Sequence, residues 1–156
     1  MFNSIYENPK YRIKRNSEYQ EMMLKLINAK IFGQYKDILM LSAVVGLLNK
    51  CPEPITKNAS DSVQMTVFDE KDKAMINMIA FSASGDASVV SQDKKYEIFE
   101  SYANGGFSKL LELLEIDDET EFTPEIVKSK VTKLFMLVVS KGFSDGSTLT
   151  LDDILL

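Results

Sequence analysis

The sequence YKDILMLSAVVGLLN occupies residues 35–49 and decides the fold. Its apolar residues recur at the helical spacing. One stripe of this helix consists of Ile38, Leu41, Val45 and Leu48. Further apolar residues occupy its other sides, and a helix that is apolar nearly all round belongs in the middle of a core. The apolar run is much shorter than the ~20 residues that a membrane span needs. We therefore expect a buried central helix and no membrane span.

Weaker helical patterns lie on both sides of this segment. The expected helices cover about 17–29, 70–82, 92–103, 107–114 and 124–140. Asp69 is a good N-cap for the helix at 70–82, in which Met75, Met78 and Ile79 would point inward. The glycines of Asn104-Gly105-Gly106 predict a stop between the helices at 92–103 and 107–114, because glycine favours the left-handed cap.

Length and composition set the fold class. The chain has 156 residues, with 45% apolar and 26% charged residues, which are close to the averages of globular proteins. Residues 63–68 read as a short strand with no visible partner, whereas 11–15 suit a short strand or an ordered arm. The sequence therefore predicts an all-α, single compact domain of about five to seven helices with at most one short strand. We expect a basic N-terminal arm over 1–16 and a helical domain over 17–156.

Few catalytic chemistries are compatible with the composition. The chain has no histidine, and Cys51 is its single cysteine. A zinc site needs clustered cysteine and histidine, and a cysteine or serine nucleophile of the usual kind needs a histidine base. No phosphate-binding loop or dinucleotide fingerprint is present. We expect neither metal nor cofactor, and the lone cysteine together with the absence of a signal-peptide pattern favours the cytoplasm.

One arrangement of acids leaves an enzymatic alternative open. Asp61 precedes Asp69-Glu70-Lys71, and metal-dependent nucleases often place an acid before an acid-x-lysine triplet on a strand. The acids would hold Mg²⁺ and the lysine would steady the attacking water. The competing interpretation is a loop that leads into a capped helix. Because an all-α fold offers no sheet for the motif, the nuclease remains a remote alternative, and we expect the protein not to be an enzyme.

The charge is unevenly distributed. The net charge is −5, but residues 1–36 carry seven basic and three acidic residues and are therefore at +4. The candidate DNA contacts of this arm are Lys10, Tyr11, Arg12, Lys14 and Arg15. Basic side chains neutralise phosphates, and tyrosine can stack on bases or donate to phosphate. The alternative is a solvated segment that packs onto the domain through Tyr11 and Ile13.

A second binding hypothesis concerns the acidic segment 112–125. It reads either as a solvated face and loop or as a docking surface for a basic partner. A protein-interaction adaptor without DNA affinity would combine this segment with an exposed apolar patch. The candidate partner contacts in that patch are Tyr102, Asn104 and Phe107. The sequence leaves the oligomeric state open.

Three stretches together carry a family resemblance. They are RIKR at 12–15 followed by SEY at 17–19, KDILMLSAVVG at 36–46 and IFESYANGGF at 98–107. In this order they resemble the small Dnd system-associated proteins, which are encoded beside bacterial DNA phosphorothioation systems. The resemblance implies a role in modification-linked restriction and hence in phage defence. Together with the basic arm, it leads us to expect a non-enzymatic accessory component that is partnered by the system's protein subunits and contacts DNA through that arm, with the adaptor as the alternative. The resemblance supplies no catalytic residues.

Overall fold

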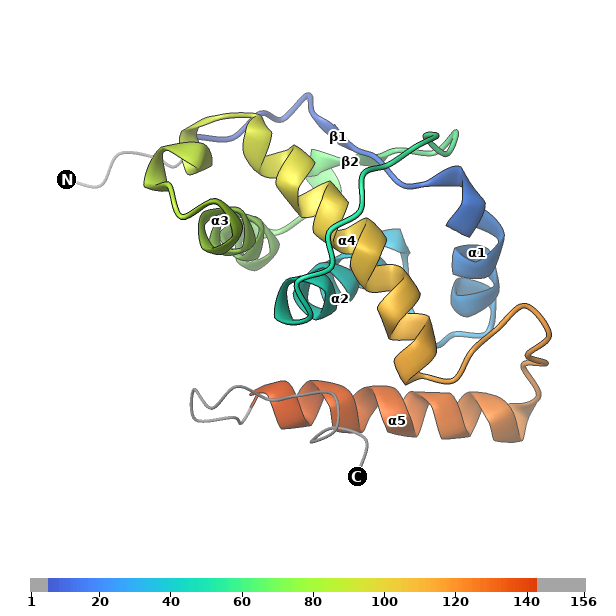
Figure 1. Cartoon of the computed structure of the whole chain (residues 1–156). Coiled ribbons are helices and arrows are strands. Elements are labelled where there is room, and N and C mark those ends of the chain that lie inside the picture. Colours follow the sequence, from blue (N-terminus) through green and yellow to red (C-terminus); the bar gives the residue numbers. More distant parts are fainter. Residues whose placement is uncertain (1–5, 143–156) are drawn as a thin grey trace.

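A computed structural model describes residues 6–142 of the chain. Its centre is the crossing of α2 (Tyr35–Leu48) with α4 (Lys94–Leu113), the two helices that pack most extensively against each other (Figure 1). Ile38 and Val45 of α2 and Phe99 and Phe107 of α4 are fully buried at this crossing. The prediction that residues 35–49 form the central buried helix is confirmed.

Three further helices surround the crossing. They are α1 (Gln20–Asn28), α3 (Glu70–Ser84) and α5 (Pro124–Gly142), and α5 lies along one side of the domain below α2 and α4 (Figure 1). Short 3-10 turns span Ser17–Tyr19, Met65–Val67 and Ala87–Ser91. The predicted all-α single domain is confirmed, with five α-helices in the part of the chain that the structure describes. None of these helices combines the length and apolar character that a bilayer crossing needs.

The small sheet differs from the prediction of at most one strand. β1 (Arg12–Ile13) pairs antiparallel with β2 (Val63–Gln64), so Arg12 faces Gln64 and Ile13 faces Val63. Ile13 is fully buried and Val63 nearly so. The strand at 63–64 thus finds its partner in the N-terminal segment, because pairing buries an apolar side chain from each strand. This segment contributes directly to the packing of the domain.

The predicted helix stop at 104–106 is wrong, because α4 continues through these residues. Their glycines serve close helix packing instead of ending the helix. A Cβ built on Gly106 would lie 1.7 Å from the carbonyl oxygen of Ser42 in α2, and one on Gly46 would lie 2.1 Å from that of Tyr102. A Cβ on Gly105 would lie 1.7 Å from the carbonyl oxygen of Cys51. The missing side chains therefore let the two backbones touch.

The boundaries of α3 follow the local sequence. The Asp69 carboxylate accepts from the Asp72 amide at 2.8 Å, and the Asp72 carboxylate accepts from the Asp69 amide at 2.9 Å. This reciprocal cap confirms Asp69 as the predicted N-cap. The helix ends at Gly85, whose φ of 69° lies in the left-handed region. Ile79 points inward as predicted, but the prediction for Met78 is wrong, since 57% of its surface is exposed.

Candidate functional site

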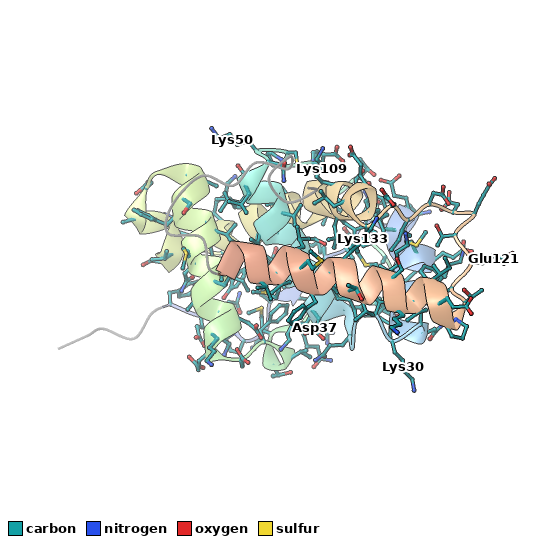
Figure 2. The ribbon with its side chains drawn as sticks, turned by 90° about the horizontal axis from the view of Figure 1, so that it is seen from below. Lys30, Asp37, Lys50, Lys109, Glu121 and Lys133 are labelled. Carbon is teal, nitrogen blue, oxygen red and sulfur yellow. The ribbon has the colours of Figure 1, made fainter. Side chains whose placement is uncertain are left out.

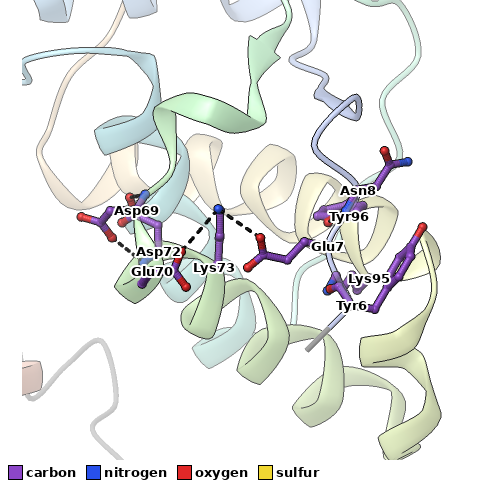
Figure 3. A network of polar contacts seen from close by, with 9 residues as sticks. All are labelled: Tyr6, Glu7, Asn8, Asp69, Glu70, Asp72, Lys73, Lys95 and Tyr96. Carbon is purple, nitrogen blue, oxygen red and sulfur yellow. Dashed lines mark hydrogen bonds and ion pairs between the residues drawn. The ribbon is translucent and has the colours of Figure 1, made fainter. Parts of the chain in front are cut away.

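The N-terminal segment is held across α3 and α4 by a polar network (Figure 3). Glu7 pairs with Lys73 of α3 at 3.2 Å, and the Asn8 amide donates to the Tyr96 hydroxyl of α4 at 2.9 Å. Lys95 of α4 is buried, and its ammonium donates to the carbonyl oxygen of Val90 at 3.0 Å and to that of Tyr6. The segment is therefore part of the folded domain, with much of its polar surface already bonded.

Arg15 lies in the interior, where it cannot contact DNA. Only 1% of its surface is exposed. Its Nε donates to the carbonyl oxygen of Asp61 at 3.1 Å, and its guanidinium also donates to Gln20 and lies 3.7 Å from the centre of the Tyr35 ring. Burial lowers the pKa of Arg15. The expectation that Arg15 contacts phosphate is contradicted, because its donors hold the loop before β2 against α1 and α2.

The other arm residues divide between surface and interior. Lys10 and Arg12 are exposed. Tyr11 is half-buried, stacks on Tyr96 with ring centres 4.4 Å apart and donates to the Glu100 carboxylate at 3.0 Å. Lys14 is half-buried, and its ammonium lies 3.3 Å from the Tyr11 hydroxyl. The exposed positive charge of the predicted site is therefore reduced to Lys10 and Arg12, with a share from Lys14.

The predicted apolar partner patch at Tyr102, Asn104 and Phe107 is not a surface. Phe107 is fully buried, Asn104 is 6% exposed and Tyr102 is half-buried. The Asn104 side chain donates to the carbonyl oxygens of Glu53 and Pro54 at 3.2 and 3.1 Å, which holds the loop after α2. Because α4 is continuous, this stretch faces α2 and that loop instead of solvent.

A group of exposed apolar side chains lies on α5. Val131, Phe135 and Val138 are exposed over 40, 67 and 47% of their surfaces, and we call these three residues the α5 stripe. Spacings of four and three residues place them on one side of the helix. Leu137 fills the inner side and is 2% exposed. Figure 2 views α5 from the side that faces away from the rest of the domain. The helical periodicity was visible in the sequence, but periodicity alone does not say which apolar side is covered.

An acidic loop leads into α5. Five exposed acids lie between α4 and α5, namely Glu115, Asp117, Asp118, Glu119 and Glu121. Glu115, at the start of this loop, pairs with Lys133 of α5 at 2.6 Å, and this ion pair lowers the pKa of Glu115. The loop is therefore tied to the helix that carries the α5 stripe, and Figure 2 shows Glu121 of the loop at one end of this helix.

Glu100 is a buried carboxylate on α4, with 5% of its surface exposed. It accepts from the Lys14 amide at 2.6 Å and from the Tyr11 hydroxyl at 3.0 Å. Burial raises the pKa of Glu100 above its ordinary value of 4.5, although the bonds from Lys14 and Tyr11 act in the opposite direction. Beside it a cavity of about 240 Å³ lies between Lys14, the loop after α2 and α4.

The raised pKa of Glu100 predicts a pH-dependent contribution to stability. The native state binds this proton more tightly than the unfolded chain, so the contribution is complete below pH 4.5 and is lost as the pH rises through the native pKa. We expect the free energy of unfolding of the wild type, relative to Glu100→Gln, to fall as the pH rises from 4.5 through the native pKa of Glu100. Urea unfolding of both proteins across this range measures it. A difference that does not change with pH would contradict this assignment.

The acids of the nuclease alternative do not form a metal centre in the described part of the chain. Between residues 6 and 142 no three acidic or cysteine side chains come together as metal ligands. The Asp69 carboxylate is engaged as the cap of α3. Asp61 contributes its backbone carbonyl oxygen to Arg15. The motif therefore marks a loop and a capped helix.

These features define the chain as a small all-α domain. Its N-terminal segment is bonded to α3 and α4, and one side of α5 exposes apolar residues. The family model of DNA sulphur modification system-associated protein 4 matches residues 12–134. The chain belongs to this family, and the resemblance to Dnd system-associated proteins is confirmed. No curated protein and no solved structure matches the chain. Membership places the protein as an accessory component associated with DNA sulphur modification systems.

Proposed function

We propose that this protein is a non-enzymatic adaptor that docks a larger protein subunit of a DNA sulphur modification system through the α5 stripe. The observation that carries the proposal is the exposure of Val131, Phe135 and Val138 on one side of a helix. Large apolar side chains grouped on a surface typically mark an interaction site. The adaptor would thereby support modification-linked restriction and defence against phage.

The chemistry of this surface selects a protein partner. An amphipathic helix docks by placing anchors at spacings of three and four residues into an apolar groove, and the α5 stripe offers anchors at those spacings. The acidic loop at the start of α5 favours basic residues at the matching edge of the groove. A net charge of −5 and the burial of Arg15 both weaken the case for DNA as the main ligand.

Phe135→Asp is expected to disrupt this docking. An aspartate at the most exposed position of the stripe would place a charge in an apolar groove, and we expect the affinity for the partner subunit to fall at least about 30-fold. The measurement is co-purification of the protein with individually tagged core subunits of the modification system, followed by titration of the subunit that binds. Circular dichroism would verify that the variant is folded.

Ser129→Asp provides the matched control for this variant. It adds the same charge to α5 at an exposed position that lies about 120° round the helix from Phe135. We expect Ser129→Asp to bind the subunit within about threefold of the wild type, because rim charges contribute little to affinity. Equal losses in both variants would show that added charge, and not the stripe, weakens the complex.

DNA contact is a second candidate, favoured by the exposure of Lys10 and Arg12. If these side chains neutralise phosphates, replacing both by alanine should weaken duplex binding and lower the salt slope by about 2. Fluorescence anisotropy of duplexes with and without phosphorothioate, at about 50 and 200 mM salt, measures both effects. Lys71→Ala with Lys128→Ala is the control, since it removes two exposed charges elsewhere. An unchanged slope in the Lys10 and Arg12 variant would remove this candidate.

A further inference from the structure

The cavity beside Glu100 has the shape and lining of a small binding site. Its volume is about 240 Å³, and it opens between the N-terminal segment, the loop after α2 and α4. Pro54 and Ile55 form an apolar wall, while Lys14, Asn58 and Glu97 add polar groups. It is thus a mixed pocket with Glu100 at its interior side.

Glu100 is 95% buried, and in the described part of the chain no cation forms a direct ion pair with it. The Lys14 ammonium acts on it only from beyond the Tyr11 hydroxyl, to which this ammonium is bonded at 3.3 Å. Its two oxygens accept one hydrogen bond each, from the Tyr11 hydroxyl and the Lys14 amide. Within residues 6–142 no ammonium or guanidinium lies within ion-pair distance of this carboxylate. A carboxylate offers about four lone-pair sites, so acceptor capacity remains on both oxygens. Buried charges are usually paired, because an unpaired one is costly to desolvate.

The groups around Glu100 favour a cation as the missing partner. Glu97 adds a second, exposed carboxylate at the rim, whereas the Lys14 ammonium is held 5.0 Å from the Tyr11 ring centre and close to its hydroxyl. The apolar wall of Pro54 and Ile55 suits a methylene stem. A planar guanidinium matches these features better than an ammonium, because it can donate to both carboxylate oxygens at once while its stem lies on the wall.

We propose that this cavity binds the guanidinium of an arginine side chain, with Glu100 as its carboxylate partner. The arginine would come from a protein subunit, so this identification of the source rests on the proposed adaptor function. The pocket would then add a specific polar contact to the apolar docking by α5. Glu97 would attract the arginine at the rim, and Glu100 would pair with it inside.

The test uses Nα-acetyl-arginine N-methylamide as the probe and the full-length protein as the receptor. Titration is followed by NMR, with the Ile55 methyl groups and the Asn58 side-chain amide as reporters of the pocket. We expect saturable shifts at both residues. The citrulline analogue has the same shape but no charge, and we expect it to bind at least about tenfold more weakly.

Glu100→Gln should weaken the probe at least about tenfold, whereas Glu97→Gln should stay within about threefold. If Glu100→Gln fails to fold, the comparison of the arginine and citrulline probes on the wild type still decides the question. The proposal is overturned by the absence of saturable shifts, by equal binding of the two probes, or by shifts confined to other parts of the protein. Phe135→Asp should bind the probe as the wild type does, so failure of the α5 docking surface and failure of this pocket are distinguishable.

Discussion

Gly106→Ala is expected to destabilise the domain by about 3 kcal/mol or more, although it replaces a glycine within a helix. The added Cβ would lie 1.7 Å from the carbonyl oxygen of Ser42 and 2.6 Å from the Gly46 amide nitrogen. Both are backbone atoms of α2, so no side chain can rotate away. The helices α2 and α4 would have to separate, which would loosen the packing around Phe107 and Phe99.

Helix propensity alone would predict the opposite effect, namely that Gly106→Ala stabilises the domain. Alanine in a helix interior is favoured over glycine by about 1 kcal/mol. Gly33→Ala is the control, since the nearest atom to its added Cβ is a carboxylate oxygen of Asp37, 3.2 Å away at the end of a side chain that can rotate. We expect this control to change stability by no more than about 0.5 kcal/mol. Urea unfolding measures both variants, and a stabilised Gly106→Ala protein would contradict the close packing of α2 and α4.

Arg15→Ala is expected to cost about 3 kcal/mol of folding free energy. It removes the donors to the Asp61 carbonyl oxygen and to Gln20, and it removes the guanidinium that lies 3.7 Å from the Tyr35 ring centre. Buried acceptors that lose their donor cost about 1–3 kcal/mol each. The same change would also leave a void where a large, 99% buried side chain now packs.

Two further variants test whether the stability depends on the buried guanidinium of Arg15 and not on a positive charge in this segment. Arg15→Lys should recover only part of the loss, because an ammonium cannot reproduce the guanidinium's several directed bonds and its stacking. Arg12→Ala removes an exposed charge from strand β1, three residues before Arg15. It should change the free energy of unfolding by less than about 0.5 kcal/mol. Thermal and urea unfolding of the three variants check this order. Equal stability of Arg15→Ala and Arg12→Ala would contradict the interior placement of Arg15.

Local sequence patterns predicted most of the fold. The apolar run at 35–49 identified the central helix, and Asp69 marked the start of α3. The glycines at 105 and 106 were misinterpreted because glycine has two uses, a left-handed cap and a close backbone approach. Only the tertiary packing of α4 on α2 distinguishes them. The sequence from Thr150 to Asp153 also suits the cap of a last helical turn, and these residues lie outside the part of the chain that the structure describes.

The binding surfaces were harder to predict for a related reason. A charged or apolar residue in the sequence does not reveal whether tertiary structure buries it. Arg15 and Phe107 are both interior, whereas Phe135 is exposed at the same helical spacing that suggests a core. The pairing of Arg12–Ile13 with Val63–Gln64 joins segments about 50 residues apart, and a local sequence pattern cannot predict such a pairing. Glu100 could not be recognised as a buried carboxylate from the sequence, because the side chain and backbone that bond to it come from Tyr11 and Lys14, more than 80 residues earlier in the chain.

The most direct test of the adaptor function is calorimetric titration of the purified partner subunit into the wild type, Phe135→Asp and Ser129→Asp at several temperatures and two salt concentrations. Docking through the α5 stripe predicts a negative heat-capacity change, binding that weakens but persists at the higher salt concentration, and loss of binding in Phe135→Asp alone. Binding that is unaffected by Phe135→Asp, or that disappears at high salt without a heat-capacity change, would contradict the account and place the interaction on a charged surface instead.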